Sequence, residues 1–222
     1  YLIQQTFHYA YDILERNSNL LEFEDMTLYD HQKQLFQHFR GAEGAQPSMV
    51  LYTAPTGTGK TMSPLGLCSN GSYKIIYICA ARHIALSLAK SAISMSKRVA
   101  FAFGCDTAAD IRLHYYAAVE YTKNTKTGGI FKVDNSNGSK VDIMICNVYS
   151  YLTAMHYMLS FNNAHNMVTY WDEPTIGMDD SDETNELHEI THRNWSENKI
   201  PNMVLSSRSE EHTSELQSRE TI

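Results

Sequence analysis

The run Ala54-Pro-Thr-Gly-Thr-Gly-Lys-Thr61 constrains this chain more than any other feature. It follows the apolar stretch at 49–52 and predicts a strand, a tight loop and the start of a helix. Two glycines let such a loop wrap backbone N–H groups around phosphate oxygens. The Lys60 ammonium can reach β- and γ-phosphates, and the Thr61 hydroxyl can hold Mg²⁺. The pattern predicts a binding site for a nucleoside triphosphate.

Around this loop, apolar strand-like runs alternate with helical stretches, which is typical of an α/β fold with a mostly parallel central sheet flanked by helices. Several runs are continuously apolar, as parallel strands buried on both faces are. The expected strands are 49–53, 74–79, 98–103, 141–146, 167–171 and 203–206. The expected helices are 4–16, 30–40, 61–67, 83–94, 107–121 and 148–159. A ligand of such a fold lies at the carboxyl ends of the strands.

The polar segment 123–140 interrupts this alternation. Its Asn137-Gly138 pair favours a tight turn, so we expect a surface hairpin that turns there. We expect this excursion to have no catalytic role.

Charge and composition leave the class of partner open. The formal net charge is -7, but residues 172–222 hold 13 acidic and 4 basic side chains, while the rest of the chain is slightly basic. Nucleic-acid binding is therefore neither indicated nor excluded by net charge. No apolar run has the length of a membrane span, so we expect a soluble protein with no membrane partner. Four widely spaced cysteines without a Cys-x-x-Cys pair favour buried thiols in a reducing, intracellular compartment.

A second motif is the strand-like run that ends in Asp172-Glu173-Pro-Thr175. At the end of a buried strand, Asp172 can hold Mg²⁺ through water opposite Thr61. Glu173 can polarise the water that attacks a γ-phosphate. The acidic residues at 179, 180, 182 and 183 are interpreted as a solvated loop rather than as further metal ligands.

Together these motifs resemble those of superfamily 2 helicases, the group of the DEAD- and DEAH-box proteins, over about residues 28–207. The phosphate loop has the form of their motif I, and 172–175 that of their motif II. The resemblance implies a RecA-like domain that uses ATP and Mg²⁺ and binds DNA or RNA. It implies catalytic roles for Lys60, Asp172 and Glu173, and Mg²⁺ ligation by Thr61 and Asp172. The implied nucleotide contacts are Gln32, Thr56, Gly57, Thr58, Gly59, Lys60 and Thr61.

Upstream, Leu28-Tyr-Asp-His-Gln32 resembles the family motif in which a glutamine reads the adenine edge. The Gln32 amide can both donate to and accept from adenine. Gln34 is the alternative candidate.

Two segments correspond to motifs that contact nucleic acid. The segment at 75–82 resembles motif Ia, with Ala-Ala in place of the usual Pro-Thr, and implies a phosphate contact from Arg82. The segment at 142–149 occupies the place of motif Ib, although its sequence departs far from the family pattern. Asn147 and Tyr149 are its candidates for hydrogen bonding and stacking.

The segment Met203-Val-Leu-Ser-Ser207 resembles the start of motif III, which couples ATP chemistry to movement, and implies that role for Ser206 and Ser207. Residues from Arg208 on resemble a reading-frame translation of a sequencing adapter, so we expect 208–222 to be an unfolded artefact. We expect 1–28 to be an extension and 29–207 to be the ATP-binding domain. The full-length parent is then expected to continue into a second RecA-like domain, and this chain alone to hydrolyse ATP very slowly.

Three other functions remain open. A packaging or translocating ATPase of another type also uses a phosphate loop, but Gln32, 172–175 and the Ser-Ser pair of motif III argue against it. A small-molecule kinase is disfavoured by the acidic pair and by the lack of an arginine-rich lid. A non-enzymatic nucleotide- or nucleic-acid-binding scaffold is the third, and the intact Lys60, Asp172 and Glu173 count against it.

Overall fold

The computed structural model describes residues 28–40, 47–55, 57–68, 73–79, 82–174 and 186–208. The expected helix at 4–16, most of the expected extension at 1–28 and residues 209–222 lie outside this part of the chain. The same holds for Thr56 and for the acidic residues at 179–183.

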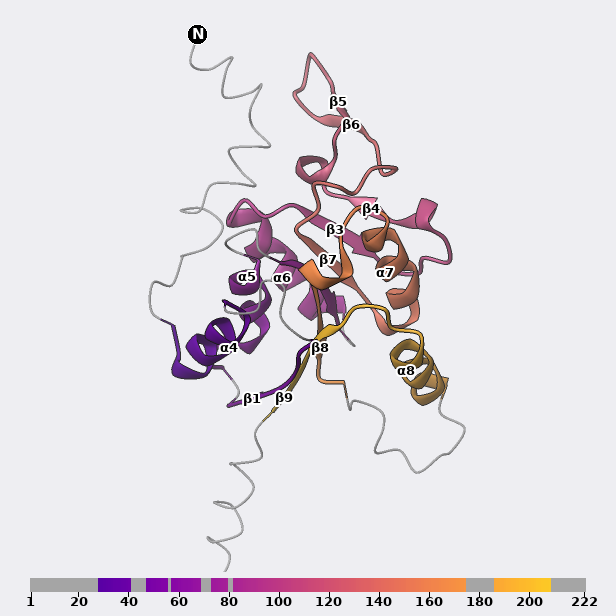
Figure 1. Ribbon diagram of the computed structural model, residues 1–222. Coiled ribbons are helices and arrows are strands. Elements are labelled where there is room, and N and C mark those ends of the chain that lie inside the picture. The colour runs from indigo at the N-terminus through magenta and orange to yellow at the C-terminus, as the bar shows by residue number, and fades with distance from the viewer. Residues whose placement is uncertain are drawn as a thin grey trace, which may run out of the picture.

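The described residues form an α/β fold built on a seven-stranded sheet in the order β1-β9-β8-β2-β7-β3-β4 (Figure 1). The strands are β1 Met49–Ala54, β2 Lys74–Ile78, β3 Val99–Ala102, β4 Arg112–Leu113, β7 Ile143–Cys146, β8 Met167–Asp172 and β9 Asn202–Arg208. Only β4 is antiparallel to its neighbour. All six expected strands are confirmed to within two residues at each end. Strand β9 runs through Arg208, whose backbone pairs with Ala54 one residue past the expected boundary.

Helices cover both faces of the sheet. Helices α4 Asp30–Arg40, α5 Ser63–Leu67 and α6 Arg82–Ser94 lie on one side, and α7 Tyr151–Leu159 and α8 Glu186–Ser196 on the other (Figure 1). Short 3₁₀ turns are Lys60–Met62, Ala108–Asp110, Tyr115–Ala117, Val148–Ser150 and Ala164–Asn166. Four of the expected helices are therefore present, and α8 was not expected. No helix in the described ranges is long and apolar enough to cross a membrane.

Each face of the sheet has its own hydrophobic core. Side chains of a strand point alternately to opposite faces, so the neighbours Ile75 and Ile76 belong to different cores. The first core holds Ile75 with Leu35 of α4 and Leu88 of α6. The second holds Ile76 with Met155 of α7. The central strands are therefore packed on both faces, and this packing holds their carboxyl ends in place.

The helix expected at 107–121 is not formed. After a single 3₁₀ turn at Ala108–Asp110, the chain runs through β4 and a second turn. The side chains of Ile111, Leu113, Tyr115 and Ala117 are all buried. A period of two suits extended chain, whereas in an α-helix these residues would point in widely different directions. Burial against the sheet edge therefore decides the conformation.

The expected hairpin exists, but it turns at a different place. Strands β5 Tyr121–Lys123 and β6 Ile130–Val133 are antiparallel and are joined by residues 124–129 rather than at Asn137-Gly138. The side-chain carbonyl of Asn124 accepts the backbone N–H of Lys126 at 2.9 Å, which shapes the turn. Gly138 instead packs against α7, where a Cβ atom would lie 2.4 Å from the Tyr157 ring.

Candidate nucleotide site

The phosphate loop follows β1 at the carboxyl edge of the sheet. Gly57 and Gly59 have φ angles of +80° and +76°, in the left-handed region that suits glycine. The Thr58 hydroxyl donates to the Pro55 carbonyl at 2.7 Å and closes the turn. Among the described residues, a Cβ atom on Gly57 would meet nothing within 4 Å, so none of them crowds the loop at this residue.

Lys60 connects this loop to the ends of two other strands. The side chain is only 9% exposed, and its Nζ donates to the Ser207 carbonyl of β9 at 2.7 Å. The same Nζ lies 3.4 Å from Oε1 of Glu173, which directly follows β8. Because β9 lies between β1 and β8 in the sheet, the three strand ends meet at one cationic group.

The two carboxylates of the second motif have different surroundings. Asp172 is 8% exposed, and its Oδ2 accepts the Tyr77 hydroxyl at 2.7 Å. Glu173 has φ +51°, and its N–H donates to the Ser206 carbonyl at 2.8 Å. A left-handed backbone costs a residue other than glycine about 1 kcal/mol, and such conformations gather at functional sites. Here that conformation turns the chain sharply at the end of β8, where Glu173 reaches Lys60.

Gln32 also reaches the phosphate loop. Its side chain is 7% exposed, its Oε1 accepts the Tyr29 N–H and its Nε2 donates to the Gly59 carbonyl, both at 3.1 Å. The amide therefore ties the start of α4 to the loop. Gln34 is exposed on the same helix. A contact between Gln32 and adenine stays a prediction.

Buried tyrosines beneath the loop escaped the sequence predictions. The Tyr170 hydroxyl donates to the Lys60 carbonyl at 3.0 Å, and the Tyr52 hydroxyl is 3.0 Å from that of Ser63. Burial raises the pKa of each of these tyrosines, so both stay neutral. In the sequence, these residues could have been found as tyrosines within otherwise apolar strands, because a buried hydroxyl usually has a hydrogen-bond partner.

His31 of α4 joins the same network. Its Nδ1 is 2.5 Å from the Tyr52 hydroxyl. Burial and the nearby charge of Lys60 lower the pKa of His31. The imidazole is therefore held toward its neutral form beside the loop.

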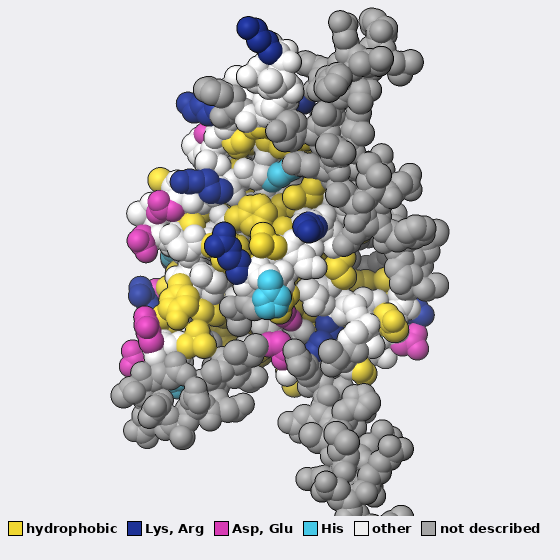
Figure 2. All heavy atoms as spheres, turned by 180° about the vertical axis from the view of Figure 1, so that it is seen from behind, with side chains coloured by type: hydrophobic (Ala, Val, Ile, Leu, Met, Phe, Trp, Pro, Cys, Tyr) yellow, Lys and Arg dark blue, Asp and Glu magenta, His cyan; other side chains and the backbone are white. Residues whose placement is uncertain are grey.

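The three residues expected to contact nucleic acid lie at the ends of β2 and β7, which are neighbours in the sheet. Arg82 is the exposed first residue of α6, and Tyr149 is 57% exposed. The Asn147 side chain accepts the Ser150 N–H at 3.0 Å and so caps a short turn. On the face seen in Figure 2, the described lysine and arginine side chains are scattered, and several of them lie next to Asp or Glu side chains. A nucleic-acid contact remains a prediction for all three residues.

The oxygen ligands expected for Mg²⁺ are a hydroxyl and a carboxylate, which suit this cation. Thr61 is half-buried in the 3₁₀ turn after the loop, and Asp172 ends β8. With Lys60 beside them as the cation expected to bind phosphate, this donor set fits a metal-bound triphosphate. The described ranges contain no cluster of three or more His, Cys, Asp or Glu that could hold a metal by itself.

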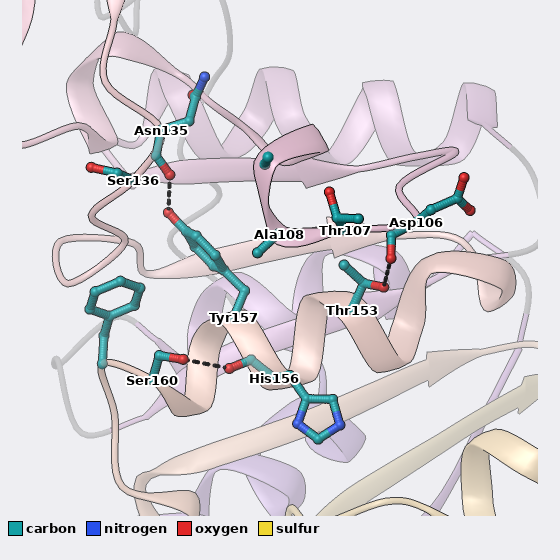
Figure 3. A pocket seen from close by; sticks show the side chains of 11 residues that line it. Asp106, Thr107, Ala108, Asn135, Ser136, Thr153, His156, Tyr157 and Ser160 are labelled. Carbon is teal, nitrogen blue, oxygen red and sulfur yellow. Dashed lines mark hydrogen bonds between the residues drawn. The ribbon is translucent and has the colours of Figure 1, made fainter.

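A groove of about 740 Å³ lies elsewhere, between α7, the turn at 107–109 and residues 135–136 (Figure 3). Two of its hydroxyls bind the groove's own backbone: Tyr157 donates to the Asn135 carbonyl at 2.8 Å, and Ser160 to that of His156 at 2.9 Å. The phosphate loop has no part in its walls. Size favours this groove as a binding site, but the convergence of charged groups favours the loop.

A scan against models of protein families finds no match to this chain. A search of curated proteins finds no matching relative. The interpretation of the site therefore depends on its own geometry.

Proposed function

We propose that this chain is the ATP-binding and hydrolysing motor domain of a superfamily 2-type helicase or translocase, with a RecA-like fold. The observation that carries the proposal is the approach of Lys60 Nζ, from the phosphate loop, to the Glu173 carboxylate at 3.4 Å. A phosphate-binding cation and a carboxylate able to act on water then face the same small region. Enzymes that transfer a γ-phosphoryl group combine a phosphate-binding cation with a residue that orients or deprotonates the attacking group.

Each side chain has a separate task in this proposal. Lys60 neutralises charge on the β- and γ-phosphates, which would exchange its ion pair with Glu173 for phosphate contacts. Glu173, released from that pair, accepts a proton from the attacking water. Thr61 and Asp172 would hold Mg²⁺, which when bound neutralises charge on the phosphate oxygens.

The hydrogen bond from Lys60 to the Ser207 carbonyl supports a coupling role for β9. If Lys60 moves when nucleotide binds, this hydrogen bond would transmit the movement to the end of β9. Arg82, Asn147 and Tyr149 are proposed to contact DNA or RNA. A second domain of the parent protein would supply arginines to the phosphate charge, and such arginines raise the rate by orders of magnitude in related enzymes.

Titration of the 222-residue chain with a fluorescent ATP analogue, with and without Mg²⁺, tests the nucleotide site. We expect binding that Mg²⁺ tightens, and a loss of at least tenfold in affinity for Lys60→Ala. Glu173→Gln should keep the binding but abolish the slow hydrolysis. Lys33→Ala, on the exposed surface of α4, is the control for a lost lysine.

Absence of analogue binding by the folded wild-type chain would overturn the proposal. Binding with hydrolysis that Glu173→Gln leaves unchanged would favour a scaffold over a motor. The titration repeated with single-stranded DNA and RNA tests the polymer partner. Strong stimulation of the ATPase by either in this chain alone would contradict the need for a second domain.

A further inference from the structure

We propose that Tyr77 is a positioning residue for the metal-binding carboxylate of this site, acting from a layer of three buried tyrosines under the phosphate loop. The inference rests on the proposed nucleotide site and deepens it. It concerns a fully buried residue, and it assigns a task to a polar group in the middle of an apolar strand.

The layer consists of Tyr52 on β1, Tyr170 on β8 and Tyr77 on β2, all on the sheet face covered by α4, α5 and α6. Each is nearly inaccessible to solvent. The ring centroids of Tyr77 and Tyr170 are 5.7 Å apart, and those of Tyr52 and Tyr170 are 6.5 Å apart. The rings therefore form a continuous aromatic support across the sheet.

Each hydroxyl of the layer holds a different part of the site. Tyr77 donates to Oδ2 of Asp172 at 2.7 Å, and Tyr170 to the Lys60 carbonyl at 3.0 Å. The hydroxyl of Tyr52 contacts Ser63, in the helix after the loop. One tyrosine thus serves the carboxylate, while the other two serve the loop and its helix.

The register of the strands explains how Tyr77 reaches the carboxylate. Tyr77 pairs with Tyr170 across β2 and β8, and Asp172 lies two residues further along β8 on the same face. A tyrosine is long enough to span this offset, whereas the isoleucines on either side of it in β2 carry no donor. With Oδ2 fixed by the phenol, the carboxylate plane has a defined orientation.

A fixed carboxylate binds a metal better than a freely rotating one. Partners that orient metal ligands typically contribute 10–100-fold to metal affinity. Removing the Tyr77 hydroxyl should therefore weaken the effect of Mg²⁺ on nucleotide binding. Removing the Tyr170 hydroxyl should disturb the loop, whose contacts form with or without metal.

The test compares Tyr77→Phe with Tyr170→Phe, two variants that each remove one buried hydroxyl from the same layer. The dissociation constant of a fluorescent ATP analogue is measured for the full chain in saturating Mg²⁺ and in EDTA. For Tyr77→Phe we expect an unchanged value in EDTA and an approximately tenfold smaller tightening by Mg²⁺. For Tyr170→Phe we expect weaker binding in both conditions and the wild-type tightening.

A wild-type tightening in folded Tyr77→Phe, with a thermal melt to show folding, would overturn the inference while leaving the nucleotide site intact. No analogue binding by the wild-type chain would instead overturn the proposed function, and this inference with it.

A second comparison covers the case in which Tyr77→Phe does not fold. Asp172→Asn is compared with Asp172→Asn/Tyr77→Phe, which lacks the phenol hydroxyl and has a neutral amide in place of the buried carboxylate. The inference expects the same response to Mg²⁺ from both. A further loss in the double variant would show that Tyr77 acts by another route, and would overturn the inference.

Discussion

Lys60 and Glu173 are 113 positions apart in the sequence, yet their charged groups lie 3.4 Å from each other. At the scale of single residues, the site is built from such long-range approaches, held in place by backbone contacts. Ser207 and Ser206 supply carbonyls to Lys60 and Glu173, and Gln32 ties the loop to α4. These residues therefore hold the proposed catalytic groups and the loop in position.

The two glycines of the phosphate loop offer a matched pair. Both have positive φ, so alanine at either costs about 1 kcal/mol of stability. At Gly59 the new Cβ would also lie 3.0 Å from Nε2 of Gln32, whereas at Gly57 it meets no described residue within 4 Å. We expect Gly59→Ala to weaken ATP-analogue binding more than Gly57→Ala, measured by fluorescence titration. Equal losses would show that the Gln32 tie has no effect on nucleotide binding.

The Asp142 carboxylate accepts hydrogen bonds from Arg98 and Lys74 at the amino ends of the strands, opposite to the ends that carry the candidate site. Burial alone would raise the pKa of its carboxyl, but hydrogen bonds from Arg98 and Lys74 outweigh burial and lower that pKa. The stabilisation is therefore present above the unfolded pKa of about 3.9 and is lost as pH falls through the folded value.

We predict that Asp142→Asn lowers the free energy of unfolding by about 2 kcal/mol at pH 7. The difference should shrink as pH falls below about 3.9, because the unfolded chain then binds a proton that the folded carboxyl, with its lowered pKa, binds only at lower pH. Urea denaturation at several pH values measures it, with the exposed Asp106→Asn as control. A difference that stays constant down to pH 2.5 would contradict the ion-pair explanation.

At the scale of elements, burial outweighs local helix preference. The sequence at 107–121 is compatible with a helix, but the described chain buries every second residue from Ile111 to Ala117 against the sheet edge. Helix α8 is the opposite case. Its polar sequence did not predict a helix, yet the helix forms and its Trp195 contacts Trp171. In both, the partner that decides the conformation is distant in the sequence.

The extended path at β4 predicts a clear alternation of mutational effects. Ile111→Ala should cost about 2–4 kcal/mol, because it leaves a cavity in the core. The exposed neighbour Arg112→Ala should cost less than about 1 kcal/mol. Chemical denaturation of the two variants gives both values. Similar costs for both would favour a different arrangement of this segment.

At the scale of the whole molecule, the last strand in the described part of the chain, β9, ends at Arg208. Strand β9 lies between β1 and β8, and it pairs with β1 over Met203–Arg208 and with β8 over Asn202–Ser206. It therefore joins the strand that carries the phosphate loop to the strand that carries the carboxylates. Without β9, neither Lys60 nor Glu173 would keep its backbone partner.

We predict that removing residues 209–222 leaves the melting temperature unchanged, because the strand pairing that the structure describes runs only as far as Arg208. Removing 202–222 deletes β9 and should prevent cooperative folding. Thermal melts followed by circular dichroism distinguish the two truncations. A clear loss of stability in the shorter truncation would contradict the interpretation of the tail as an adapter-derived segment.

The sequence by itself determined the α/β class, all six parallel strands and the candidate groups Lys60, Asp172 and Glu173. It could do so because strand and loop patterns are local and phosphate binding needs few residue types at fixed spacing. Only the tertiary structure decided which groups meet. Strand order and register set the approach of Lys60 to Glu173 and of Tyr77 to Asp172. Such contacts depend on packing between distant segments, which no local pattern encodes.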